Sequence, residues 1–404
     1  HNNGSILYKV GNSATFSKPD GEIDSAGYNA SAGVVAAAVT VSGESNTTKQ
    51  LFVNNSDMTI GAAYDKNVDY GGTYGTAAVK VDKQGAADNY GVISLEKFDV
   101  DFSQFNVGLW MDSAATAEAY ANNYGSIVVD ATNSTAIRND SNQGGTASNF
   151  GNIYLNGKYG YGMAVTTSQG TIFNGRADGP LDSVNTIYAS GEGSVGMFIQ
   201  NGTGYNYGSI YLQGDNTTAI QLDGETASLR VQGNIYHNPE YDGITYFWTS
   251  NGASYTLDYP GGVEVENYTL GKATDSGKLT VSGNSTVYVR GENSYLLIGN
   301  SGAELYNYGT LYASAGASPI VVSGEAKVAN GGTINISGGG NAMQGADNNT
   351  ILQNLPDGVI NVNNGNGMYA SNLASPTNYG TINVQEGVGM YLTGMTLSGA
   401  TTGN

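Results

Sequence analysis

Residues 149–153 read Asn-Phe-Gly-Asn-Ile, and this motif returns along the chain with few changes. Each full copy has an asparagine, an aromatic residue and a glycine, and then isoleucine or leucine two positions after the glycine. The other copies are residues 89–93, 123–127, 206–210, 307–311 and 378–382. Weaker copies at 232–235, 331–334 and 357–360 keep the glycine and an apolar residue. Gly125 and Gly151 are 26 residues apart, and Gly358 and Gly380 are 22 apart. Such a period indicates a repeat architecture.

A second mark follows each glycine by 10 to 12 residues and consists of a small residue before methionine or alanine. Five of the eight methionines take this position: Met163, Met197, Met343, Met368 and Met390. Methionine fills irregular gaps in cores, so we expect one equivalent internal site in each repeat. Met197 lies 12 residues after Asn185, which indicates a further repeat starting at 185–187 and makes residues 166–184 an insertion.

Units of 22–26 residues are too short to close a core alone, but stacked coils bury a continuous one. We therefore predict an all-β fold, a parallel β-helix with about 22–26 residues per coil. Ile127, Ile153, Ile210 and Ile382 should form one internal ladder, and the five methionines another. The recurring glycine suits a corner with positive φ or close backbone packing.

Composition excludes several other classes. The 404 residues include 60 glycines, which disfavours helical bundles, and the formal net charge of −19 disfavours nucleic acid as a partner. The sequence has no cysteine, so neither disulfides nor thiolate metal sites are expected. No apolar run reaches the roughly 18 residues that a membrane span needs.

The motifs Asn-Tyr-Gly-Ser-Ile at 123–127 and Gly-Met-Tyr-Leu-Thr-Gly at 389–394 resemble the passenger repeats of bacterial type V autotransporter adhesins, most closely the fusobacterial outer-membrane type. The resemblance covers about residues 89–404. It implies a right-handed β-helix displayed at the bacterial cell surface, with host-cell attachment or self-association as its role. It also implies a host-cell protein or glycan, or a second copy, as partner, with the anchoring translocator barrel outside these residues.

The pattern divides the chain in two. Residues 1–88 carry few marks and are expected to be divergent N-terminal coils or a cap, whereas residues 89–404 are expected to be a regular β-helix. Irregular insertions are predicted near 96–120, 166–184 and 236–260.

The last of these insertions is the predicted contact surface. Exposed aromatic clusters mark contact surfaces for sugars or proteins, and the residues that we expect to bind a partner are Tyr241, Tyr246, Phe247, Trp248 and Tyr255. The alternative is that these rings are internal stacks of a regular coil.

Catalytic and metal chemistry find weaker support. Asp99 and Asp101 share one strand face and are a weak candidate for a calcium site, but no calcium-loop motif accompanies them. We expect no resident metal, no cofactor and no enzymatic activity. Two alternatives remain open: a purely structural stalk or fibre subunit, and a polysaccharide lyase or hydrolase, since parallel β-helices also carry those activities.

Overall fold

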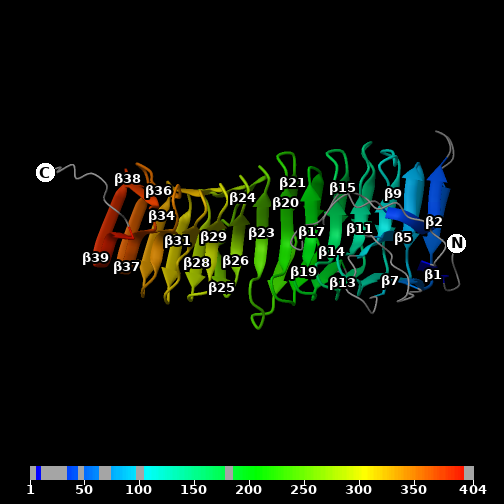
Figure 1. The fold of residues 1–404 in the computed structure, drawn as a ribbon, viewed down its shortest axis with the longest axis horizontal. Coiled ribbons are helices and arrows are strands. Elements are labelled where there is room, and N and C mark those ends of the chain that lie inside the picture. The colour runs from blue at the N-terminus through cyan, green and yellow to red at the C-terminus, as the bar shows by residue number, and fades with distance from the viewer. Residues whose placement is uncertain are drawn as a thin grey trace. The chain divides into compact units, whose positions relative to one another are not determined.

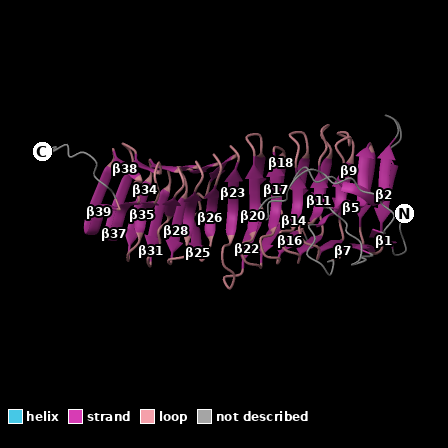
Figure 2. Ribbon diagram, in the orientation of Figure 1, coloured by secondary structure: helices cyan, strands magenta, loops and turns pink. Residues whose placement is uncertain are grey.

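The computed structural model describes residues 6–10, 34–43, 50–62, 74–96, 104–177 and 185–394. These residues form strands joined by turns and loops, with no helix among them, as Figure 2 shows. Equivalent strands of successive coils pair in parallel, which confirms the predicted parallel β-helix. The chain divides into two compact units: unit 1 is His1–Leu222 with Thr226–Ile244, and unit 2 is Asp223–Glu225 with Thr245–Asn404.

Unit 1 is built from three parallel sheets (Figure 1). The first contains β1 (Ile6–Val10), β4 (Met58–Ala62), β7 (Val92–Leu95), β10 (Ser126–Val129), β13 (Asn152–Leu155), β16 (Thr186–Ala189), β19 (Ser209–Leu212) and β22 (Asn234–His237). The second contains β2 (Val34–Gly43), β5 (Tyr74–Lys83), β8 (Gln104–Met111), β11 (Thr135–Asn139), β14 (Tyr161–Val165), β17 (Val195–Gln200) and β20 (Thr218–Asp223). The third contains β3 (Gln50–Asn54), β6 (Gly85–Asn89), β9 (Tyr120–Asn123), β12 (Thr146–Asn149), β15 (Thr171–Asn174), β18 (Thr203–Asn206) and β21 (Ser228–Val231).

Unit 2 repeats the plan with its own three rows of strands. The first row is β25 (Val263–Glu266), β28 (Thr286–Arg290), β31 (Thr310–Ser314), β34 (Thr333–Ser337) and the beginnings of β37 (Val359–Ser371) and β39 (Thr381–Thr393). The second is β23 (Thr245–Ser250), β26 (Thr269–Ala273), β29 (Tyr295–Gly299), β32 (Ile320–Val322), β35 (Asn341–Gly345) and the ends of β37 and β39. The third is β24 (Ser254–Leu257), β27 (Lys278–Val281), β30 (Glu304–Asn307), β33 (Lys327–Asn330), β36 (Ile351–Asn354) and β38 (Ser375–Asn378).

The core of each unit follows from the two-residue period of a strand. In β13, Ile153 and Leu155 are buried while Asn152 and Tyr154 face outward. Because parallel pairing is in register, Ile153 stacks on Ile127 below it and on Ile187 above it. A column of buried apolar side chains thus runs through the coils of unit 1.

The pairings within each unit confirm the predicted stacking of equivalent residues. Ile127, Ile153 and Ile210 belong to the ladder of unit 1, whereas Ile382 pairs with Ile360 in unit 2. Likewise Met163 pairs with Met197 in unit 1, and Met343, Met368 and Met390 follow one another in unit 2.

The glycine of the motif is required by close packing. A Cβ added to Gly151 would lie 2.0 Å from the carbonyl oxygen of Gly125 in the preceding coil, and Gly151 does not have a positive φ. Of the two explanations that the sequence offered, close approach of backbones is therefore the correct one here.

The asparagine of the motif forms a buried hydrogen-bonded ladder. In unit 1 the side-chain amides run Asn54, Asn89, Asn123, Asn149, Asn174 and Asn206, each Nδ2 donating to the Oδ1 of the next residue at 2.7–2.9 Å. Val231 takes the position after Asn206, and the buried Nδ2 of Asn206 has no hydrogen-bond partner among the described residues. The ladder therefore stops where the repeated asparagine stops. Unit 2 has its own ladder, Asn307, Asn330, Asn354 and Asn378.

Regular strands occupy much of the predicted insertions, which corrects that prediction. Within 96–120, β8 pairs with β11 and β9 begins; within 166–184, β15 pairs with β12 and β18; within 236–260, β23 and β24 pair with β26 and β27. Apart from β9, which ends at Asn123 of a full motif, these strands lack the asparagine–aromatic–glycine mark, so counting that mark overlooked them. Within residues 1–88, the described strands β1 to β6 take places in the same three sheets as the later coils.

Candidate functional site

The predicted aromatic residues do not form one exposed patch. Tyr241 belongs to unit 1 and is half-buried in the turn after β22, while the other four belong to unit 2. β23 alternates, so Phe247 points into the core and is 2% exposed. A side chain this buried cannot contact a partner, and Phe247 is removed from the candidate surface.

Two of the predicted tyrosines stack on buried aromatic rings. Tyr255 stacks on Phe247 with ring centres 4.9 Å apart, and Tyr246 stacks on Tyr268 at 4.3 Å. Burial raises the pKa of Tyr255 to about 12 and also raises the pKa of Tyr246. Both rings are half-buried.

Trp248 lies on the outer side of β23, opposite Phe247. Its Nε1–H donates to the Thr274 hydroxyl at 3.0 Å, and the Lys272 ammonium lies 4.3 Å from the ring centre. Burial lowers the pKa of Lys272. The indole is thus oriented by fixed neighbours and remains partly accessible, so it is the predicted contact residue best placed to meet a partner.

The weak calcium candidate, Asp99 with Asp101, lies outside the described residues. In the part of the chain that the structure does describe, no three histidine or carboxylate side chains gather in a way that would hold a metal ion.

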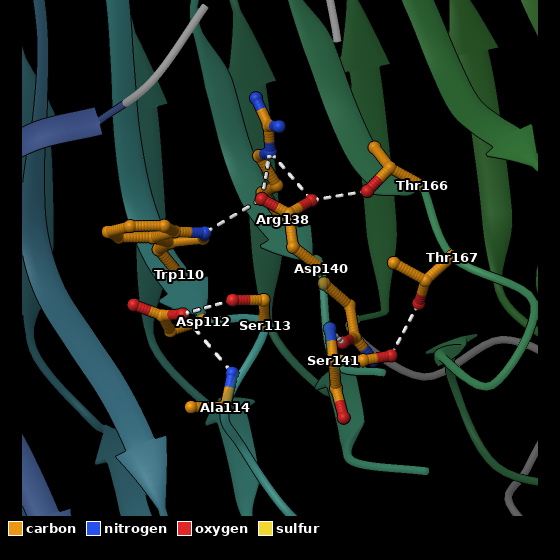
Figure 3. Close-up of polar contacts among 10 residues, drawn as sticks. Trp110, Asp112, Ser113, Ala114, Arg138, Asp140, Ser141, Thr166 and Thr167 are labelled. Carbon is orange, nitrogen blue, oxygen red and sulfur yellow. Dashed lines mark hydrogen bonds and ion pairs between the residues drawn. The ribbon is translucent and has the colours of Figure 1, made fainter. Parts of the chain in front are cut away.

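A polar cluster that the sequence did not single out lies on the outer face of the second sheet of unit 1 (Figure 3). Asp140 accepts hydrogen bonds from Trp110 Nε1 at 2.9 Å, from Arg138 Nε at 2.7 and 2.8 Å, and from the Thr166 hydroxyl at 2.5 Å. Trp110 and Arg138 are in register on adjacent strands, so the cluster comes from coil stacking. The Asp140 carboxylate already accepts hydrogen bonds from three side chains. The cluster is therefore suited to holding neighbouring coils together rather than to binding a ligand.

A second ion pair extends the cluster. Lys80 pairs with Asp112, and its ammonium lies 4.7 Å from the Trp110 ring centre. Burial tends to raise the pKa of Asp112, but hydrogen bonds from Lys80, Ser113 and the Ala114 N–H outweigh it and leave the pKa below its ordinary value of 3.8.

A depressed carboxyl pKa predicts acid sensitivity. Asp112 stabilises the fold above its unfolded-state pKa, and that stabilisation is lost as pH falls through the lower folded-state pKa. We expect the urea midpoint of the wild type to fall between about pH 5 and about pH 3, and the fall to be smaller in Asp112→Asn. Identical pH profiles for the two proteins would contradict a stabilising role for the ionised carboxylate.

A groove of about 560 Å³ lies in unit 2, on the outer face of the first row of strands. One outward column on this face reads Glu264, Tyr288, Tyr312, Asn335, Asn361 and Asn383 on successive strands. Tyr288 and Tyr312 stack with ring centres 5.2 Å apart and planes 13° from parallel. Beyond Tyr312 the column changes from rings to shorter amides.

The amides continue the column as a hydrogen-bonded floor. Asn361 Nδ2 donates to Asn335 Oδ1, and Asn383 Nδ2 donates to Asn361 Oδ1, both at 2.9 Å. The neighbouring outward column changes in the same way, from Arg290 to Ser314 and then Ser337. The groove exists because large side chains give way to small polar ones in both columns, at β31 in one and at β34 in the other.

No protein-family model matches the chain, and no curated protein matches it. Among the described residues, no helix is long and apolar enough to cross a membrane.

Proposed function

We propose that the chain is the β-solenoid passenger of a bacterial surface adhesin, which attaches to host cells or associates with other copies of itself. One observation carries the proposal: the outward positions of the coils hold columns of stacked tyrosines. In unit 1 the column is Tyr154, Tyr188, Tyr211 and Tyr236, with ring centres 4.7–5.4 Å apart. Outward tyrosines supply rigid contact area at low entropic cost, which a passive stalk does not require.

The passenger repeats described above support the location. A chain of this kind is exported by the type V route and held at the bacterial surface by a region outside these residues. Its partner is a host-cell protein or glycan, or a second copy. The enzymatic alternative has less support, because no Asp, Glu or His is among the described residues that line the groove, and lyases and hydrolases need such groups at the substrate.

Direct binding tests the proposal. The purified chain, fluorescently labelled, is incubated with cultured epithelial cells and with beads coated in the same chain. Saturable binding to either surface, competed by unlabelled protein, is the expected result. Binding to neither surface would contradict the proposal and favour the alternative of a purely structural stalk.

Trp248→Ala is expected to weaken cell binding at least about tenfold, because outward aromatic residues dominate contact energies. Its loss of one hydrogen bond to Thr274 should cost only about 1 kcal/mol of stability. Binding is measured by flow cytometry and stability by urea unfolding.

Trp110→Ala is the matched control. Trp110 is also outward, donates its Nε1–H and has a lysine over its ring, but it belongs to unit 1. Equal loss of binding in both variants, or large destabilisation of Trp248→Ala without a binding defect, would remove Trp248 from the contact surface.

A further inference from the structure

The groove of unit 2 has the parts of a binding site for a ring-shaped polar ligand. One face of the Tyr312 ring is stacked on Tyr288, and its other face looks along the column toward Asn335, where the next side chain is too short to cover it. Tyr312 is 44% exposed. A ligand ring placed above Asn335 would therefore extend the stack by one step.

The floor below that position offers paired donors and acceptors. Each Asn side chain carries two N–H donors and a carbonyl acceptor, and the ladder through Asn335, Asn361 and Asn383 uses only part of this capacity. Ser337 lies alongside in the neighbouring column and its hydroxyl bonds to the Ala313 carbonyl. A ligand whose every unit presents hydroxyl groups, each both donor and acceptor, matches this floor along its length.

Charge selects a neutral ligand. Arg290 is the charged side chain among the described groove residues, and its guanidinium pairs with the Glu264 carboxylate at 2.9 Å. The formal net charge of −19 repels anions further. An acidic sugar or a phosphorylated ligand would therefore find no unpaired cation in this groove.

We propose that this groove binds a neutral oligosaccharide that lies along the stacking direction of the coils, with one pyranose ring stacked on Tyr312 and the next units over the Asn335–Asn361 floor. The apolar C–H face of a pyranose is electropositive and complements the negative face of a tyrosine ring. The groove volume of about 560 Å³ falls within the range of small-molecule sites. The inference rests on the proposed adhesive function, for which it names the ligand class.

The test uses the purified full chain and labelled linear tetrasaccharides. Neutral members are built from glucose, galactose, mannose or N-acetylglucosamine, and anionic members from galacturonate or sulfated galactose. We expect saturable binding of at least one neutral member below about 1 mM, the weak limit of specific affinity, by fluorescence anisotropy. No saturable binding of any neutral member, or tighter binding of the anionic members, overturns the proposal.

Three variants locate the site. Tyr312→Ala removes the platform and should weaken binding at least about tenfold. Asn335→Tyr extends the tyrosine column into the groove and should block binding while preserving the fold. The matched control is Tyr391→Ala: Tyr391 is 45% exposed and stacks on Tyr369 at 5.4 Å in the same unit, but does not line the groove. Unchanged binding by Tyr312→Ala, or equal loss in Tyr391→Ala, overturns the assignment.

The outcomes also separate this inference from the adhesin proposal. If the chain binds cells and Tyr312→Ala binds them equally well, while no tetrasaccharide binds, adhesion stands and the glycan groove fails. If tetrasaccharides bind through Tyr312 but the chain attaches to neither cells nor chain-coated beads, the groove stands and the adhesive role fails. Thermal unfolding of each variant confirms that it is folded.

Discussion

Gly151→Ala is expected to destabilise the protein by about 3 kcal/mol, because the new methyl group would meet backbone rather than a movable side chain. The added Cβ would lie 2.0 Å from the Gly125 carbonyl oxygen and 2.8 Å from the Tyr124 carbonyl carbon. The coils cannot separate to make room, since the adjacent strands β10 and β13 are in register and hydrogen-bonded. Urea unfolding followed by circular dichroism measures the loss.

Gly261→Ala is the control for this substitution. No atom lies within 4 Å of a Cβ built at Gly261, and its φ is not positive. A surface change of this kind should stay within about 0.5 kcal/mol. If the two variants lose equal stability, close packing at the corner is not the reason for the motif's glycine.

Asn149→Ala should cost at least about 3 kcal/mol, because it removes the middle of a buried hydrogen-bonded ladder. The Asn149 side chain accepts from Asn123 Nδ2, donates to Asn174 Oδ1, and accepts from the Gly151 N–H at 3.3 Å. Each buried group left without its partner costs about 1–3 kcal/mol. The change is measured by urea unfolding, and hydrogen exchange should show the largest loss of protection in the coils next to the substitution.

The control here is Asn156→Ala. Asn156 is exposed and donates one hydrogen bond, to Asp130 at 2.8 Å. Its removal should change stability by less than about 1 kcal/mol, because water replaces the lost partner. A comparable loss at Asn149 would mean that the ladder contributes little to the fold.

The repeated motif was sufficient to predict the coils. A glycine, an inward isoleucine and a methionine at constant spacing predict parallel stacking, because equivalent residues must lie above one another to share a core. Met197 even located the coil that begins at Asn185, whose strand β16 pairs with β13. The asparagine ladder has the same origin, although its hydrogen bonds became visible only in the structure.

The outward face was predicted less well. Tyr246, Phe247 and Trp248 are adjacent in sequence, so they were predicted to lie in one aromatic cluster. Because side chains alternate along a strand, Phe247 points into the core and Trp248 points outward. The predicted aromatic patch is therefore divided between the core and the outer face of the strand. The direction of each side chain became known only from the structure.

The repeat in the sequence by itself determined that this chain is a stack of parallel coils with isoleucine and methionine at fixed internal positions. Only the tertiary structure decided what the aligned outward positions form. Gly309 and Gly332 of the motif place Tyr312 and Asn335 in register, but a hollow depends on the relative sizes of the side chains in two adjoining columns. For the same reason the groove, which begins where tyrosine gives way to asparagine on adjacent strands, has no signature in the linear sequence.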